Sequence, residues 1–190
     1  MTYHDGTLEL TYPLYRHEKS SSRLTRFIWA VVEVLDIPCA CAGAGSTTLR
    51  RKEEGPKKGS GKEPDTSFHI TNEHRIRERD EIDLDVDPPP DLAIEVDNTA
   101  DSEAKLPVYA KLGVPEVWRY DAKTGSLWFG RLQTDGTYRP IERSECLPML
   151  TPALVLDALG RCRGVEESRW GRLLRDWVRA ELAPNDGGEH

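Results

Sequence analysis

The sequence lacks any segment that could cross a membrane. Its longest apolar run, FIWAVVEVLDI at residues 27–37, is interrupted by Glu33 and Asp36, whereas a membrane-spanning helix needs about 20 apolar residues. The N-terminus, MTYHDGTLEL, has no basic start followed by an apolar core, so it is not typical of a secretory signal. These two absences predict a cytoplasmic protein with no membrane partner.

Cysteine is also scarce, with four residues in the chain. Zinc sites usually show two close pairs of cysteines, whereas this chain has one Cys-Ala-Cys, at Cys39 and Cys41, and two scattered residues, Cys146 and Cys162. Without a secretory signal, disulfide bonds are not expected either. We therefore interpret the cysteines as free, buried thiols.

Positive charge is in deficit. The 190 residues include 26 Lys and Arg against 33 Asp and Glu, which gives a net charge of −7. Because phosphate contacts need a local surplus of Lys and Arg, this balance does not favour a general nucleic-acid-binding protein. It does not exclude a nuclease, since carboxylates that hold a metal ion lower the net charge. The length suits one compact domain with a buried core.

Hydrophobic periodicity predicts the elements of a mixed domain. Apolar residues at three- and four-residue steps predict a helix over residues 17–36, and alternation predicts a strand over residues 91–98. A second helix is expected over residues 101–113. The other segments are a strand at the end of 41–51, a flexible charged loop at 52–64, a strand at 64–70, a connection at 71–90, an antiparallel meander at 115–143, a helix or strand at 153–160 and an amphipathic helix at 165–183. This order predicts an α/β fold with a central mixed β-sheet flanked by helices.

Residues 88–105, PPPDLAIEVDNTADSEAK, place three carboxylates on the most strand-like segment of the chain. On a strand, side chains two residues apart share a face, at a rise of about 3.3 Å per residue. Asp91 and Glu95 then lie roughly 13 Å apart, too far for one ion, whereas Glu95 and Asp97 are roughly 6.6 Å apart and can line one site. A neighbouring strand is only about 4.8 Å away, and the preceding strand offers Asp65 as a second ligand.

Crowded carboxylates repel one another, and a divalent cation removes that repulsion. Mg²⁺ or Mn²⁺ prefers oxygen ligands and keeps several waters, which is the arrangement used in phosphodiester hydrolysis. Lys105 follows on the next predicted helix, where its ammonium group could hold the attacking water or offset charge in the transition state. The alternative is an ordinary solvent-exposed acidic face, since short patterns of this kind are weak evidence for a site.

Two longer segments, GKEPDTSFHI at residues 61–70 and DPPPDLAIEVDNTADSEAKLPVYAKLGVPEVWRYD at residues 87–121, resemble the family of proposed restriction endonucleases called Uma-two, within the PD-(D/E)XK nuclease superfamily. The resemblance runs from PLYRHEKSSSRL to ECLPMLTP and so covers most of the chain. It implies a restriction-endonuclease-like domain over residues 1–160. A C-terminal amphipathic helix at 161–183 would pack on this domain, and residues 184–190 would form a disordered tail.

The resemblance also implies residue roles. Asp65 matches the metal-binding aspartate, and Glu95 matches the acidic position of the (D/E)-x-K element. The superfamily's lysine falls at position 97, where this chain has Asp97. A lysine from the following helix is implied to take its place, and Lys105 is at the expected position. Asp97 is then available as a further metal ligand.

From the residues and the resemblance together, we predict a Mg²⁺- or Mn²⁺-dependent DNA endonuclease that forms a homodimer. Its predicted catalytic residues are Asp65, Glu95 and Lys105, and its predicted metal ligands are Asp65, Glu95 and Asp97. The alternative is a non-catalytic binding or regulatory module that keeps the nuclease fold. The acidic net charge and the missing strand lysine favour that alternative.

Three other polar positions receive weaker predictions. His17, at the start of the first helix, is expected to cap the helix or lie on the surface. Glu33, near the apolar face of that helix, is a candidate for supporting the site. Lys62, together with Lys57 and Lys58, is expected to lie in a solvated loop, with contact to a nucleic-acid phosphate as the alternative.

Overall fold

The computed structural model describes residues 2–4, 7–9, 15–41, 48–52, 59–97, 104–161 and 163–183. In these ranges, no helix has both the length and the apolar character needed to cross a membrane. The helices are α1 (Tyr15–Val34), α2 (Glu73–Ile76), α3 (Leu106–Leu112), α4 (Pro152–Arg161) and α5 (Glu167–Glu181).

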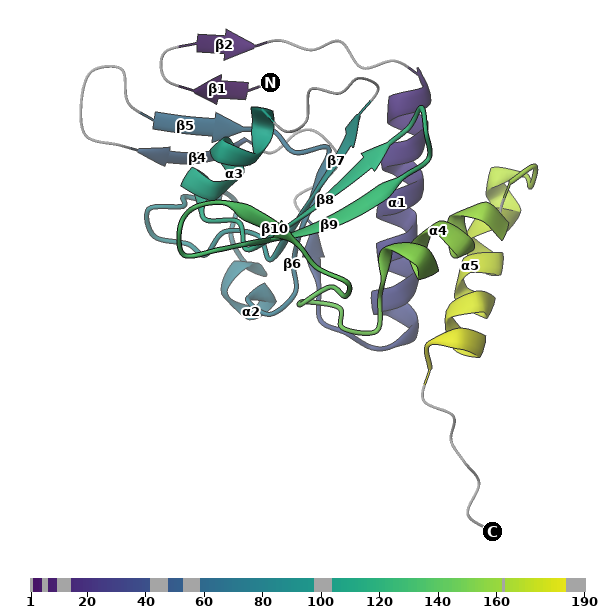
Figure 1. The fold of residues 1–190 in the computed structure, drawn as a ribbon. Coiled ribbons are helices and arrows are strands. Elements are labelled where there is room, and N and C mark those ends of the chain that lie inside the picture. The colour runs from purple at the N-terminus through teal and green to yellow at the C-terminus, as the bar shows by residue number, and fades with distance from the viewer. Residues whose placement is uncertain are drawn as a thin grey trace.

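A six-stranded mixed sheet forms the centre of the described part of the chain (Figure 1). Its central pair, β7 and β8, is parallel, and the other neighbours are antiparallel. The strand order is β10 (Tyr138–Pro140), β9 (Leu127–Leu132), β8 (Glu116–Asp121), β7 (Leu92–Asp97), β6 (Thr66–His69) and β3 (Ala40–Cys41). A four-stranded sheet lies beside it, in the order β2 (Thr7–Glu9), β1 (Thr2–His4), β5 (Gly59–Lys62) and β4 (Leu49–Lys52).

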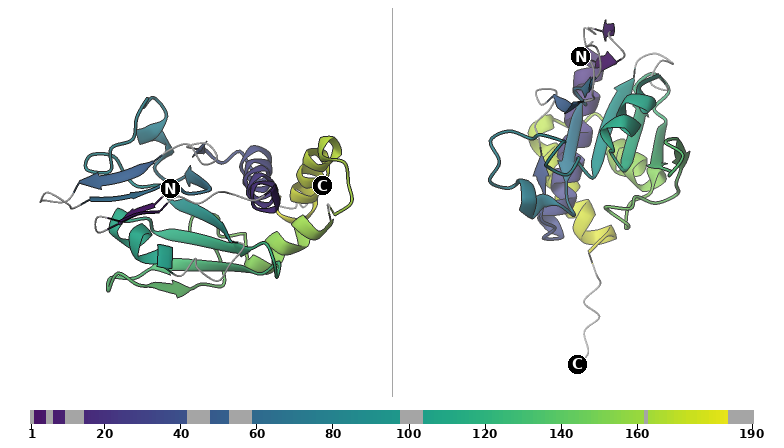
Figure 2. Two further views of the ribbon diagram at one scale, coloured as in Figure 1. Left: turned by 90° about the horizontal axis from the view of Figure 1, so that it is seen from above. Right: turned by 90° about the vertical axis from the view of Figure 1, so that its left-hand side faces the viewer.

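Helices α1 and α4 cover one face of the central sheet, and α5 lies on the outer side of α1. α1 packs on β7, α4 packs on β9, and α5 packs on α1. Seen from above, α1 lies between the sheet and α5 (Figure 2). The three- and four-residue spacing of Leu24, Phe27, Ile28 and Val31 gives α1 its apolar face, and all four side chains are fully buried.

The opposite face of the central sheet is covered by α3 and the four-stranded sheet. α3 contacts both β4 and β5, and a second apolar cluster joins Leu49, Tyr109 and Leu112 to Ala93 and Val117 of the central sheet. β7 is therefore buried on both sides. Its alternate residues Leu92, Ile94 and Val96 belong instead to the core around α1.

The predicted α/β architecture is confirmed, including the antiparallel meander of β8, β9 and β10 and the C-terminal helix. The segment at 153–160 forms the helix α4, and the connection at 71–90 contains the short helix α2. α3 begins at Leu106, after a 3-10 turn at residues 104–105, and it ends at Gly113 in the left-handed conformation (φ 77°) that favours glycine. Residues 101–103 of the predicted helix lie outside the described ranges.

One expectation about local structure is wrong. The charged segment at 52–64 contains the strand β5, because Gly59–Lys62 pairs with both β1 and β4. The sequence GSGK has no hydrophobic alternation, so tertiary pairing determines this strand. Lys57, Lys58 and the predicted tail at 184–190 lie outside the described residues.

Candidate functional site

The centre of the candidate site is Glu95, whose side chain is almost completely buried. Its Oε2 atom accepts a hydrogen bond from Lys105 Nζ at 2.9 Å, and its Oε1 atom lies 3.0 Å from Lys62 Nζ. The hydroxyl of Tyr109 also donates to Oε1. A carboxylate in the interior is thus held between two lysines and one phenol, which come from β5, the start of α3 and α3 itself.

These contacts decide the charge state of the site. Burial opposes the ionised form of Glu95, but the positive charges of Lys62 and Lys105 outweigh it and hold the pKa of Glu95 below its usual range. Burial also works against the charge on Lys105, yet its contact with Glu95 raises the Lys105 pKa above its ordinary value. Burial and the neighbouring Glu95 carboxylate raise the pKa of Tyr109. Glu95 is therefore ionised at neutral pH, and Lys105 and Tyr109 keep their protons.

Asp65 lies immediately before β6 and beside Glu95. The antiparallel register that pairs Thr66 with Ile94 brings residue 65 opposite residue 95. Asp65 Oδ2 accepts a 2.7 Å hydrogen bond from the backbone N–H of Val96, which ties the two strands at this point. The strand register and this hydrogen bond thus place Asp65 next to Glu95, which in turn binds Lys105.

His17 holds the other side of Asp65. Its Nε2 atom lies 3.1 Å from Asp65 Oδ2, and this hydrogen bond raises the pKa of His17 above its ordinary value, against the effect of partial burial. The first turn of α1 therefore reaches the site, and the expectation of a cap or surface role for His17 is wrong. Glu33 lies elsewhere, 3.8 Å from Arg175 of α5, and is exposed.

Asp97 completes the acidic side of β7. One oxygen lies 3.5 Å from Lys105 Nζ, and the other lies 4.0 Å from Nε of Arg119 on the neighbouring strand. All six residues of β7 are buried, so the alternative of an ordinary exposed acidic face is wrong. The layer of α3 and the four-stranded sheet covers the face that carries Glu95.

The donor atoms fit a hard divalent cation in chemical type, because Asp65, Glu95 and Asp97 offer carboxylate oxygens. Within the described residues, however, no three His, Cys, Asp or Glu side chains are arranged to hold a metal ion. Instead, Lys62 and Lys105 each occupy one oxygen of Glu95. The donor set therefore fits an oxygen-preferring cation in chemistry, whereas in this arrangement both oxygens of Glu95 are taken by lysines.

Sequence reasoning missed three contacts of this site, those of His17, Lys62 and Tyr109. Lys62 was expected in solvent, but it is only 4% exposed. In the sequence, its one indication of a role was its position three residues before Asp65. Tyr109 follows Lys105 by four residues, so both face the same side of a helix. That spacing could have paired the two side chains in advance.

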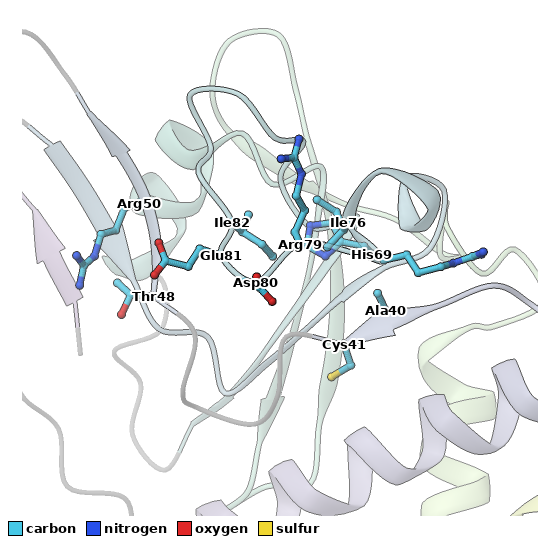
Figure 3. A pocket seen from close by; sticks show the side chains of 11 residues that line it. Ala40, Cys41, Thr48, Arg50, His69, Ile76, Arg79, Asp80, Glu81 and Ile82 are labelled. Carbon is cyan, nitrogen blue, oxygen red and sulfur yellow. The ribbon is translucent and has the colours of Figure 1, made fainter.

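A separate pocket of about 600 Å³ opens at the edge of the central sheet (Figure 3). It is lined by the ends of β3, β4 and β6 and by residues 76, 77 and 79–82, with Arg50, His69, Arg79 and Asp80 among its side chains. None of the predicted catalytic or metal-binding residues lines it. The carboxylate cluster and this pocket are therefore two separate places in the protein.

Comparison with known proteins finds similarity both to a protein family and to solved structures. A family model described as "Putative restriction endonuclease" (Uma2) matches residues 1–161. Among solved structures, the fold is similar to that of "a putative nuclease belonging to DUF820" from Anabaena variabilis ATCC 29413, with a TM-score of 0.55 and 17% sequence identity over 82% of this chain and 89% of that chain. At this identity the structural likeness supports the fold alone. No curated protein matches the chain.

Proposed function

The chain belongs to the Uma2 family of putative restriction endonucleases, and on that premise we propose that it is a metal-dependent endonuclease that hydrolyses phosphodiester bonds in DNA. The observation that carries the proposal is the convergence of Asp65, Glu95 and Lys105. Two carboxylates lie side by side on paired strands, and an ammonium group contacts one of them at 2.9 Å. This combination suits an oxygen-bound cation next to a positively charged donor.

Each side chain has a role in the proposal. Asp65 and Glu95 would hold Mg²⁺ or Mn²⁺, and Asp97 would add a third carboxylate. A divalent ion in this position supplies a Lewis acid for the phosphate and lowers the pKa of bound water. Lys105 contacts both Glu95 and Asp97, and there its ammonium group would orient the attacking water and offset charge on the phosphate. His17 would keep Asp65 oriented.

A non-catalytic binding or regulatory module is the second candidate. Two observations favour it: Asp97 stands where the superfamily has its lysine, and two lysines already neutralise Glu95. Such a module would keep the fold and bind DNA without hydrolysing it.

The test is a cleavage assay on supercoiled and linear DNA, with Mg²⁺, Mn²⁺ or EDTA, run beside a salt-dependent DNA-binding assay. Metal-dependent nicking that Glu95→Gln and Lys105→Met both abolish would support the nuclease. Arg179→Gln, on the exposed face of α5, is the control and should cut as well as wild type. Salt-dependent binding with no cleavage under any metal would support the module.

The proposal extends to a homodimer, because two sites are needed to cut both strands of a duplex in one encounter. α5 presents Leu173 to solvent, 42% exposed, beside several arginines. Light scattering after size-exclusion chromatography would give the mass directly, and a monomer with or without DNA would leave the protein as a nickase.

A further inference from the structure

Lys62, like His17 and Tyr109, contacts the site but belongs to none of the motif positions identified in the sequence. It comes from β5 of the four-stranded sheet, yet its side chain is 5% exposed and its ammonium nitrogen lies 3.0 Å from Glu95 Oε1. The same nitrogen donates to the backbone carbonyl of Glu63 at 3.0 Å and lies 6.0 Å from the centre of the Tyr109 ring. A buried lysine is costly to desolvate, so this placement requires the carboxylate that it contacts.

Glu95 does not need two lysines to be neutral. Lys105 contacts Glu95 at 2.9 Å, and although it also lies 3.5 Å from Asp97, that second carboxylate has Arg119 at 4.0 Å as a further cation. The second ammonium group, from Lys62, occupies Oε1 together with the Tyr109 hydroxyl. A divalent ion held by Asp65 and Glu95 would therefore compete with the Lys62 ammonium group for Oε1 of Glu95.

We propose that Lys62 is a positioning residue that occupies Glu95 in place of the metal ion and releases Glu95 when a DNA phosphate enters the site. This inference rests on the nuclease function proposed above. A phosphate provides a second anion for the Lys62 ammonium group, and the departure of that group frees Oε1 for the ion. The metal and the DNA then bind cooperatively, because each favours the state in which Lys62 has left Glu95.

The contact with the Glu63 carbonyl makes this exchange feasible. When Lys62 leaves Glu95, its nitrogen can keep that backbone acceptor, so the ammonium group is not left without a partner. The free protein holds its metal site closed, and the closed form needs no ion to balance the buried carboxylate. Metal binding is thereby weakened in protein that has no DNA bound.

The experiment is a calorimetric titration of Mn²⁺ into wild type and into Lys62→Gln without DNA. Removing the competing charge should tighten Mn²⁺ binding at least about fivefold, the lower end of typical coupling between two sites. A merely structural role for Lys62 predicts unchanged or weaker Mn²⁺ binding, because loss of a structural contact does not improve metal binding. Lys111→Gln, at an exposed position on α3, is the matched control and should bind as wild type does.

A second titration uses a phosphorothioate duplex that resists hydrolysis. The duplex should tighten Mn²⁺ binding to wild type more than it does to Lys62→Gln, in which Glu95 is already free. If Lys62→Gln binds Mn²⁺ no more tightly than wild type, the role of Lys62 is overturned and the nuclease proposal stands. If neither protein binds Mn²⁺, with or without the duplex, both proposals are overturned.

Circular dichroism will show whether Lys62→Gln folds. If it does not, the wild-type protein labelled with ¹⁵N-lysine provides the test. Addition of Mg²⁺ and the duplex should shift the side-chain ammonium signal of Lys62. An unshifted Lys62 signal, while the Lys105 signal titrates, would overturn the exchange.

Discussion

At the scale of single residues, Glu95 carries the largest consequence. Glu95→Ala leaves the ammonium groups of Lys62 and Lys105 without their anion, and breaking a buried ion pair in this way costs about 3–5 kcal/mol. We expect a loss near the lower figure, since Lys105 is 20% exposed at its side chain and keeps Asp97, together with loss of Mn²⁺ binding. Urea denaturation and calorimetry measure the two effects.

A second buried carboxylate provides the control for that variant. Glu116 accepts hydrogen bonds from the backbone N–H groups of Glu145 and Cys146 and from the indole of Trp118, and burial raises its pKa. Glu116→Ala should lower stability by about 1–3 kcal/mol, because it leaves buried donors unpaired. Mn²⁺ binding should be unchanged. Equal loss of metal binding in both variants would mean that unfolding, and not the site, explains the result.

His17 gives the site a pH dependence of known sign. Its hydrogen bond to Asp65 raises the pKa of His17 above the ordinary value of 6.5. The stability that the pair contributes is therefore fully present below pH 6.5 and is lost as the pH rises through the higher, folded-state value. Thermal melts between about pH 6 and 9 should show wild type losing more stability than His17→Gln over that range. Parallel curves would contradict the ion pair.

Contacts of the site that arise from strand periodicity and pairing could be predicted from the sequence, whereas those that depend on how the layers pack could not. Strand periodicity and pairing put Asp65 beside Glu95 and put Asp97 on the same side, so the arrangement of these carboxylates could be predicted. Lys62 could not be, since its approach to Glu95 depends on how the four-stranded sheet docks against α3. That docking leaves no periodic signal in GSGK.

At the scale of elements, α5 is a helix that lies beyond the part of the chain matched by the family model and packs on it. The family match ends at residue 161, and α5 packs its apolar side on α1 through Trp170, Leu174, Trp177 and Val178. The ring of Trp177 lies 6.0 Å from that of Phe27. α5 therefore covers apolar surface of α1 that the domain would otherwise expose to water.

Trp177→Ala should lower the free energy of unfolding by about 3–5 kcal/mol, the usual cost of deleting a large buried aromatic side chain. Leu173→Ala is the matched control on the same helix, because Leu173 is 42% exposed, and it should change stability by less than about 0.5 kcal/mol. Chemical denaturation of both variants measures the difference. Equal effects would show that α5 does not pack as described.

Elements were predictable where packing and sequence pattern agree. α1, β7 and α5 follow from helical or alternating apolar positions, because each presents a stripe to a core. β5 and the short α2 do not, since β5 is held by pairing with β1 and β4 and α2 by local turns. The start of α3 also differs from the prediction, and residues 101–103 lie outside the described ranges.

At the scale of the whole molecule, the site lies between two layers that fold around it. Glu95 has a pKa held below its usual range, so its charge contributes stability above the ordinary glutamate pKa of 4.5, and this contribution is lost as the pH falls through the lower, folded-state value. The urea midpoint should therefore fall between about pH 5 and 3. Wild type should lose more than Glu95→Gln over the same interval. A greater loss in the variant would contradict the assigned direction.

The burial of Glu95 between Lys62 and Lys105 also constrains how the family can diverge. Loss of the glutamate alone is a costly first step for a lineage that abandons hydrolysis, because the buried Lys62 would lose the carboxylate that it contacts, while Lys105 would keep Asp97. Substitution of either lysine first is milder, since the other still balances the carboxylate. In descendants that lose hydrolysis, we therefore expect the lysine at position 62 to be replaced before the glutamate at position 95. A survey of relatives in which the acid disappears while both lysines persist would contradict this order.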